Sequence, residues 1–401
     1  MLIIGKNFDN IAFEDAIQAV YSEDSRMIRI PYTILTKDLG GSARLLQLLA
    51  TWSRLKSGDA TLKLYSESTS EPGFKKFAST PFGLAALIFC DKIQTSKGEE
   101  IARREALKYS TDYVRTMHSG PLVDLRSYNK SSLPIICIDR AKTLRRPTRL
   151  YVGDTGEVRG KSDFSNLTRA CFEVIQTIGG ASSAVENYND ISHLIHEAFL
   201  NTHEHAQDDE WGRPYERSIR GISISFRDLN TKIIGSNYSR IGSVEAYLSS
   251  FRLKKSNLTQ AQFAEVSIFD SGPGLALNWL QKNNRLTPEI DREMRSELGK
   301  NLLDELEAVQ SCLTKGATTK GRESRGMGMF RMMQVIKNTG GFISVRSGRL
   351  SLAKHFDHPS NEIISDVDLD LFDINSGGMP DKALPRVEGT VISALIPLNR
   401  G

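Results

Sequence analysis

The sequence predicts an α/β fold in two parts, a smaller α/β domain in residues 1–150 and a second α/β unit in residues 161–401. Segments in which apolar and polar residues alternate, as in strands, are interspersed with segments whose apolar residues recur every three or four positions, as in helices. The 401 residues are enough for two ordinary domains, and no internal repeat or low-complexity tract interrupts them.

Five segments of residues 1–150 have a clear pattern. Strands are predicted at 27–31, 62–65 and 133–138, the last with a proline confined to its start. Helices are predicted at 43–56, after two glycines, and at 83–92, after the capping sequence Ser79-Thr80-Pro81. No acid, base or nucleophile stands in a recognisable arrangement, so this part of the sequence does not indicate its role.

Residues 161–401 continue the alternation of helices and strands. Helices are predicted at 166–178, 190–207, 288–313 and 330–338, with a shorter amphipathic segment at 244–253. Strands are predicted at 222–226, 265–269, 342–346 and 389–397, and the acidic stretch 361–381 is expected to be a surface excursion.

The composition excludes several classes of protein. A hydrophobic share of 39% with a charged share of 25% rules out collagen-like, disulfide-scaffold and wholly disordered chains. The longest apolar run, residues 82–90, is about half the roughly 20 residues that span a bilayer, and Lys6 and Asp9 interrupt the N-terminus where a signal peptide would be apolar. We therefore expect a cytoplasmic protein without membrane association, whose four widely spaced cysteines are reduced.

The net charge of +4 neither requires nor excludes nucleic acid as a partner. One local basic cluster could contact phosphates; its members are Arg140, Lys142, Arg145, Arg146 and Arg149. Because no aromatic residues are interleaved with it and no nucleic-acid motif accompanies it, a solvated loop is the favoured interpretation, and nucleic acid as a partner is unsupported.

Glu197 and Asn201 stand four residues apart on the predicted helix 190–207. At that spacing both side chains lie on one face, where an amide oxygen can complete a Mg²⁺ shell and a carboxylate can deprotonate a water. The same pair is also common on solvated helix faces, so it does not define a site alone.

Two glycine-rich turns complete the candidate chemistry. Asp270, Gly272 and Gly274 follow a predicted strand directly, and this tight turn lets backbone approach a ligand, although a plain β-turn has the same composition. Gly326, Gly328 and Met329 precede a predicted helix, whose unpaired N–H groups can bind an anion, unless the glycines only form a linker. Basic residues lie nearby at Lys315, Lys320, Arg322 and Arg325.

In this order, the three pieces resemble the ATP-binding domain of the GHKL superfamily, which includes gyrase-type topoisomerases, chaperones of the Hsp ninety class, sensor histidine kinases and MutL proteins. Glu197 to Asn201 is similar to its N box, Asp270 to Gly274 to its first glycine box, Gly326 to Met329 to its second, and Gly389-Thr390 to its terminal Gly-Thr element. The resemblance covers roughly residues 161–401.

The resemblance implies a Bergerat-type α/β sandwich, a mixed sheet covered by helices on one face, that binds Mg-ATP. It implies Glu197 as general base and Asn201 as the Mg²⁺ ligand. It further implies Asp270 as acceptor for the adenine amine, Gly272 and Gly274 as the walls of the adenine pocket, Gly326 and Gly328 as phosphate binders followed by Met329, and Thr390 as a contact on the adenine side.

The resemblance also implies an ATP lid at residues 275–325, a loop that closes over nucleotide. This lid is about fifty residues long and contains a predicted charged helix, which departs from the compact lid of most sensor kinases. Residues 230–260 resemble a further insertion. No family pattern assigns a lysine to the γ-phosphate, so the four basic residues before Gly326 remain candidates.

Four of the seven histidines fall between His193 and His205, so a transition-metal site and a phosphoacceptor histidine are two further hypotheses. His196 and His203 are about two helical turns apart, roughly 10 Å, which is too far for one metal ion. His193 and His196 could share an ion, but no further ligands are evident. A phosphoacceptor histidine would need an upstream helical hairpin, which the sequence before residue 161 does not contain.

We therefore expect a protein that binds Mg-ATP and hydrolyses it slowly, as a conformational switch controlling self-association as a homodimer or a protein partner. One alternative is a protein kinase, either a serine kinase of the anti-sigma type or a histidine kinase. The other is a nucleotide-sensing adaptor that binds ATP without cleaving it.

Overall fold

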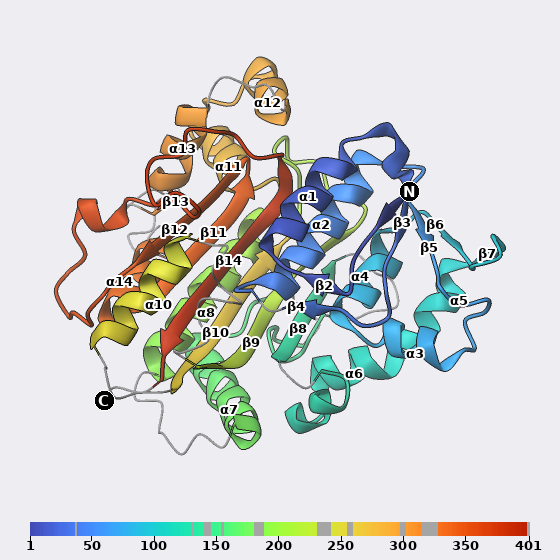
Figure 1. The fold of residues 1–401 in the computed structure, drawn as a ribbon, viewed down its shortest axis with the longest axis horizontal. Helices are drawn as coiled ribbons and strands as arrows, with labels where there is room; N and C mark the ends of the chain where they lie inside the picture. The colour runs from blue at the N-terminus through green and yellow to red at the C-terminus, as the bar shows by residue number, and fades with distance from the viewer. Residues whose placement is uncertain are drawn as a thin grey trace.

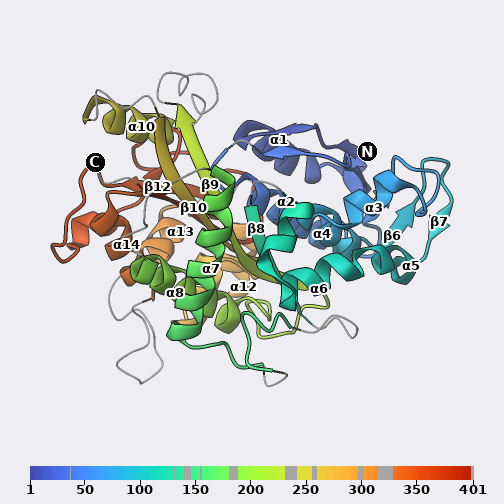
Figure 2. The same ribbon diagram turned by 90° about the horizontal axis from the view of Figure 1, so that it is seen from below.

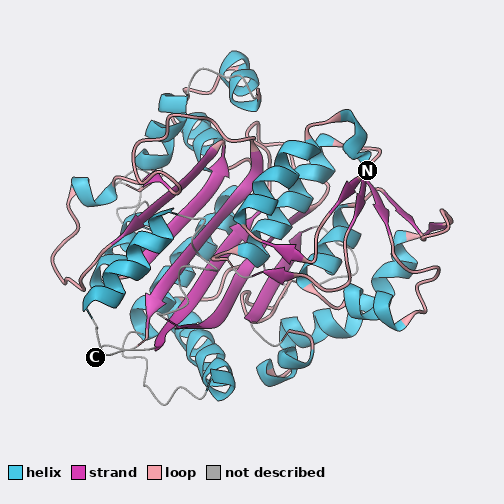
Figure 3. Ribbon diagram, in the orientation of Figure 1, coloured by secondary structure: helices cyan, strands magenta, loops and turns pink. Residues whose placement is uncertain are grey.

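The computed structural model describes residues 1–36, 38–129, 132–139, 146–153, 156–179, 188–230, 242–254, 260–296, 302–313 and 328–398. Helices flank β-sheets in both halves of the chain, so the predicted α/β class is confirmed (Figures 1 and 3). None of the helices within these ranges has the length and apolar character needed to cross a membrane.

The first sheet is formed by short strands in the order β1 (Leu2–Ile3), β3 (Met27–Arg29), β5 (Thr61–Lys63), β6 (Lys92–Gln94) and β7 (Glu100–Ile101). β1, β3, β5 and β6 pair in parallel because a helical crossover follows each of the first three; β7 folds back antiparallel. The crossover helices are α1 (Asn10–Val20), α2 (Gly41–Leu55), α3 (Pro72–Ala78) and α4 (Pro81–Phe89).

The helix predicted at 83–92 begins two residues earlier, at Pro81, and its expected N-cap, Thr80, is present. Thr80 Oγ1 accepts a hydrogen bond from Gly83 N at 3.0 Å, and proline occupies the first helical position. Three further small elements complete this half: a two-strand pair of β2 (Asn7–Phe8) with β4 (Leu35–Thr36), α5 (Arg103–Leu107) and α6 (Thr111–Ser119).

The second sheet has seven strands in the order β13-β12-β11-β14-β10-β9-β8. Their bounds are β8 (Ser132–Asp139), β9 (Ser218–Asn230), β10 (Gln260–Asp270), β11 (Phe342–Gly348), β12 (Leu350–His355), β13 (Phe372–Asp373) and β14 (Val387–Pro397). β8 pairs with β9 along its whole length, so this strand of residues 1–150 belongs to the sheet of the second half.

The expectation of a mixed sheet is wrong for the described strands, because every neighbouring pair in this sheet is antiparallel. The reason is the last strand. β10 and β11 point in the same direction, but β14 inserts between them and runs antiparallel to both. Insertion of the closing strand thus converts a potential parallel pair into two antiparallel pairs.

Helices cover both faces of this sheet, which corrects the expectation of helices on one face only (Figures 1 and 2). One face is apolar and packs against α7 (Lys161–Gly179), α8 (Tyr188–His205) and α14 (Gly328–Thr339). The opposite face carries serines such as Ser267 and Ser393, whose hydroxyl oxygens lie 2.9 Å apart, and is covered by α2 and by α10 (Gly242–Lys254). The first half of the chain therefore supplies a layer of the second.

A continuous hydrophobic core joins the two halves, with members from Ile4 to Leu398. Within it, α2 places Leu48, Leu49 and Trp52 out of contact with solvent. The division at residue 150 therefore separates stretches of sequence that share one core.

The predicted charged helix at 288–313 consists of two shorter helices, α12 (Pro288–Arg295) and α13 (Leu302–Ser311). They follow α11 (Leu275–Lys282), and both α11 and α13 pack apolar residues into the core, among them Leu277, Leu280 and Leu306. The first part of the expected lid is thus a set of packed helices. The described chain stops at residue 313 and resumes at residue 328, so the rest of the expected lid lies outside it.

A buried ion pair anchors α13 to the sheet. Glu305 Oε2 accepts from Arg349 Nε at 2.7 Å, Glu305 Oε1 accepts from Arg349 N at 2.8 Å, and the two side chains are 1% and 0% exposed. Removal of one partner leaves the other as a buried charge without this counterion, which costs far more than the pair contributes.

Glu305→Ala is therefore expected to lower the free energy of unfolding by about 3–5 kcal/mol, measured by urea denaturation. Glu307 on the same helix is a matched control, because its ion pair with Arg285 is exposed at the surface. Glu307→Ala is expected to change the free energy by about 1 kcal/mol or less. Equal losses in the two variants would contradict the structural role of the buried pair.

Candidate functional site

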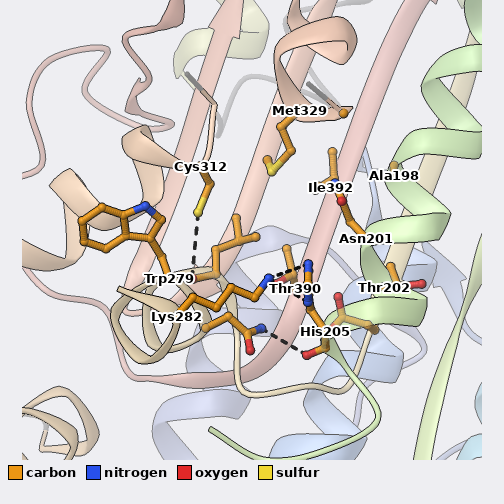
Figure 4. Close-up of a pocket in the computed structure, with 14 residues that line it drawn as sticks. Ala198, Asn201, Thr202, His205, Trp279, Lys282, Cys312, Met329, Thr390 and Ile392 are labelled. Atoms are coloured by element: carbon orange, nitrogen blue, oxygen red, sulfur yellow. Dashed lines mark hydrogen bonds between the residues drawn. The ribbon is translucent and has the colours of Figure 1, made fainter. Parts of the chain in front are cut away.

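A hollow between α8, α11, α14 and the apolar face of the sheet is lined by fourteen residues (Figure 4). The space inside, including its open mouth, is about 780 Å³. The lining residues are Ala198, Asn201, Thr202, His205, Asp270, Leu275, Asn278, Trp279, Lys282, Cys312, Gly328, Met329, Thr390 and Ile392. A mostly apolar wall with a few polar groups is typical of sites for small organic ligands.

Two helices each present one face to the hollow. On α8 the lining residues follow the i, i+3, i+4, i+7 spacing and are Ala198, Asn201, Thr202 and His205. On α11 they follow the same spacing and are Leu275, Asn278, Trp279 and Lys282. The α11 stripe was not identified from the sequence as part of the site. Its helical spacing is readable, but the sequence does not show that this face lies opposite α8.

Asp270 and Thr390 reach the hollow together because they are opposite each other in the β10–β14 register. Gly272 N donates to Asp270 Oδ1 at 2.8 Å, and the Thr390 hydroxyl lies 3.2 Å from the Ser347 hydroxyl. Burial raises the pKa of the Asp270 carboxyl to about 6, although backbone N–H groups of Gly272 and Thr390 lower it. At neutral pH the carboxyl is therefore mostly ionised and can accept hydrogen bonds. Its burial removes part of its hydration.

Gly272 and Gly274 do not line the hollow, but they allow the turn beside it to pack closely. Gly389 N donates to Gly272 O at 2.7 Å, and a Cβ on Gly272 would lie 2.7 Å from Ala206 Cα. Gly274 has a φ of +92°, which disfavours any side chain. These two glycines therefore act through the backbone path that positions Asp270.

Glu197 lies next to the hollow, in contact with the start of α14. A Cβ on Gly328 would lie 3.2 Å from Asn201 Nδ2 and 3.5 Å from Glu197 Oε2, so the backbone at Gly328 lies against both side chains of the predicted pair. Gly328 and Met329 open α14 and line the hollow, whereas Gly326 lies outside the described residues.

Two cations hold the Glu197 carboxylate. Glu197 Oε1 is 2.9 Å from Lys161 Nζ and 3.1 Å from Arg331 Nη1, while the nearest ring nitrogen of His196 is 3.8 Å away. The His196 imidazole and the Lys161 ammonium lower the pKa of the Glu197 carboxyl to about 2, against the opposing effect of burial. In this arrangement Glu197 is ionised but a weak base.

The basic residues proposed for the γ-phosphate all lie outside the described residues; they are Lys315, Lys320, Arg322 and Arg325. Within the described chain, Lys282 is a lysine on the wall of the hollow, with its Nζ 2.6 Å and 2.8 Å from the two ring nitrogens of His205 (Figure 4). Asn278 Nδ2 also donates to His205 O at 3.2 Å, so α11 and the end of α8 are connected across the hollow.

The histidines of α8 form no transition-metal site in the described structure, which contains no group of three or more His, Cys, Asp and Glu side chains suited to a metal ion. His203 lies 3.3 Å from the Tyr151 hydroxyl, and burial together with Arg220 lowers its pKa to about 4, so it is neutral at pH 7. The described cysteines are all free thiols.

The basic cluster of residues 140–149 is described only at its last two arginines. Arg146 donates to Gly156 O at 3.1 Å, and Arg149 donates to Met117 O at 3.1 Å. Both guanidinium groups are therefore engaged by backbone carbonyls of the protein itself.

The structure thus brings Asn201, Asp270, Gly328, Met329 and Thr390 to one hollow, with Glu197 beside it. Comparisons of this chain with models of protein families, with curated proteins and with solved structures gave no match.

Proposed function

We propose that the hollow binds Mg-ATP and that this half of the chain is a Bergerat-type domain of the GHKL kind, a variant in which the described strands are all antiparallel and α2 and α10 cover the second face of the sheet. The observation that carries the proposal is the convergence of four separate segments on one hollow: α8 with Asn201, β10 with Asp270, α14 with Gly328 and β14 with Thr390. Each segment supplies the group that the resemblance assigns to it.

The chemistry of the wall supports an adenine at one end and phosphates at the other. Asp270 offers a carboxylate to an exocyclic amine beside the apolar surface of Ile392 and Met329, which suits a purine ring. At the other end, Asn201 offers an amide oxygen to Mg²⁺, and the backbone at Gly328, where the described part of α14 begins, lies against Asn201, so that its N–H groups are available to phosphates. ATP has both the amine and the metal-bound phosphates that such a wall would recognise.

Slow hydrolysis is proposed because of the ion pairs at Glu197. The carboxylate is placed to accept a proton from a water, but the His196 imidazole and the Lys161 ammonium hold its pKa at about 2, and Arg331 is a further cation 3.1 Å from it. A base that must first lose these partners gives a low turnover, which suits a switch controlling self-association or a protein partner.

The same ion pairs favour one second candidate, an adaptor that binds nucleotide without cleaving it. If Lys161 and Arg331 stay on Glu197 when nucleotide binds, no base is available. This adaptor differs from the switch in turnover and agrees with it in binding.

The test is calorimetry with Mg-ATP, followed by incubation with γ-labelled ATP. We expect saturable binding and slow release of labelled phosphate. No binding would overturn the proposal for the site. Binding without phosphate release would indicate the adaptor, and label retained on the protein would indicate a kinase.

A further inference from the structure

The helix α2, which belongs to the first half of the chain, contacts two backbone segments beside the hollow: the turn that follows Asp270 at the end of β10, and residues 387–389 of β14, which precede Thr390. Gln47, Thr51 and Arg54 follow one another at i, i+4 and i+7, so they form one stripe on the helix. Each of the three makes a hydrogen bond to backbone within two residues of Asp270 or Thr390. None of them lines the hollow.

Arg54 makes the central contacts. Its guanidinium donates to Gly272 O at 3.1 Å and to Ser271 O, and it forms an ion pair with Glu388 at 2.7 Å. The same group lies 3.6 Å from the centroid of the Tyr215 ring. A planar fork with five donors can hold two carbonyls and a carboxylate at once, which no other side chain reproduces.

Gln47 and Thr51 contact the second segment, the start of β14. Gln47 Nε2 donates to Gly389 O at 3.3 Å, and Glu388 N donates to Thr51 Oγ1 at 2.9 Å. The two segments are joined to each other, since Gly389 N donates to Gly272 O, the carbonyl that also accepts from Arg54. A displacement of α2 would therefore move both segments.

The backbone of these two segments has little conformational freedom to accommodate such a displacement. Gly389 has a φ of +74°, and a Cβ there would lie 2.0 Å from Asp270 O. At its other end α2 is also fixed to β10, because Gly40 N donates to Glu265 Oε1 at 2.9 Å. The helix thus spans β10 from Glu265 to the turn after Asp270.

The contacts reach the region of the expected lid as well. Glu388, the partner of Arg54, also lies 3.4 Å from Arg295 on α12. Arg295 pairs in turn with Glu210, whose side chain is 3% exposed. One buried carboxylate therefore connects the first half of the chain, α12 and the strand that carries Thr390.

We propose that Arg54, Thr51 and Gln47 are positioning residues for the adenine end of the hollow, and that the first half of the chain responds to nucleotide through α2. This inference rests on the proposed function of the hollow. Coupling between sites is reciprocal. If α2 sets the position of Asp270, a ligand bound to Asp270 must in turn stabilise α2 in the position in which it makes these contacts. The first half is thereby assigned a role that its own sequence does not indicate.

The test compares Arg54→Gln with Arg26→Gln, in the full chain, by calorimetry with Mg-ATP. Arg26 is a matched control because its ion pair with Asp59 is exposed at the surface and involves neither the turn after Asp270 nor β14. We expect Arg54→Gln to raise the dissociation constant about 10- to 100-fold, since two hydrogen bonds to the turn are lost. Turnover at saturating nucleotide should be unchanged, because Glu197 and Asn201 do not contact α2.

A more conservative variant and a measurement on the wild-type protein distinguish the positioning role from a loss of folding in Arg54→Gln. Thr51→Val keeps the shape of the side chain but removes its hydrogen bond with Glu388 N, and it should raise the dissociation constant about 3- to 10-fold. Hydrogen exchange of α2 amides in the wild-type protein should slow when Mg-ATP is added.

Failure of this inference can be separated from failure of the proposed function. If the wild-type protein binds no Mg-ATP, the hollow is not a nucleotide site and the inference falls with it. If the wild-type protein binds, but the Arg54 and Thr51 variants bind equally well and α2 exchange is unchanged by nucleotide, only the positioning role is overturned.

Discussion

Asp270→Asn is expected to weaken the binding of Mg-ATP by about 10- to 100-fold. The carboxylate accepts a hydrogen bond from the adenine amine, and a hydrogen bond to a charged group contributes about 1.5–3 kcal/mol, where 1.4 kcal/mol is tenfold in affinity. An asparagine offers one neutral acceptor oxygen in place of two oxygens that share a negative charge, and Gly272 N already donates to one of those two. Calorimetry at pH 7 measures the change, and an unchanged affinity would contradict the adenine assignment.

The pH dependence gives an independent check on Asp270. Its pKa of about 6 lies above its usual value of 3.8, so the carboxylate that the amine requires is lost as the pH falls through about 6. We expect the affinity of the wild-type protein for Mg-ATP to decrease from pH 7 to pH 5, and that of Asp270→Asn to change less over this range. A nucleotide with a carbonyl at the position of the amine, such as GTP, should bind poorly at pH 7, where Asp270 is ionised and cannot donate to that carbonyl.

Loss of binding in this variant is not expected to come from unfolding. Because the pKa of Asp270 is raised in the folded state, its ionisation costs stability as the pH rises from about 4 to about 6, and the cost persists at pH 7. Replacement by a neutral side chain removes this cost. The temperature of unfolding at pH 7 should therefore stay within a few degrees of the wild-type value.

Glu197→Gln is expected to reduce ATP hydrolysis by about 10²- to 10⁴-fold while binding is retained. The amide keeps the shape of the side chain but cannot take a proton from water. Phosphate release under saturating Mg-ATP measures the loss, and calorimetry measures the binding. Glu173→Gln, at an exposed carboxylate of α7, is the control and should hydrolyse ATP at the wild-type rate.

Two outcomes would contradict the role of Glu197. Hydrolysis that is unchanged in Glu197→Gln would exclude it as the base. Binding that is lost together with hydrolysis would assign Glu197 to ligand binding.

Local patterns in the sequence predict most of the elements that build the hollow. The alternation in residues 222–226 and 265–269 corresponds to β9 and β10, and the apolar spacing around Asn201 corresponds to α8. These predictions succeed because the period of a strand or a helix is written in consecutive residues. The prediction of one long helix at 288–313 is wrong. The segment between the two observed helices, residues 296–301, is mainly polar, and in the sequence it cannot be told from the solvated face of a continuous helix.

The order of the strands could not be read from such patterns. The position of β14 between β10 and β11 depends on contacts between segments far apart in the chain, as does the pairing of β8 with β9. The same is true of the cations on Glu197, because Arg331 lies 134 residues away along the chain. The four-residue spacing of Glu197 and Asn201 predicts a shared face but not the basicity of the carboxylate.

The pattern of the sequence predicts that Asp270 follows the end of a strand and that Thr390 stands near the start of another, both next to apolar residues. What covers the serine-bearing side of the sheet depends on contacts between segments that are distant in the chain. Alternating serines are compatible with water or with a second layer, because a small hydroxyl can be satisfied by solvent or by a neighbouring strand. Here α2 forms that layer, and its Arg54 reaches the turn beside Asp270, a contact across 218 positions between Arg54 and Gly272 that no local pattern encodes.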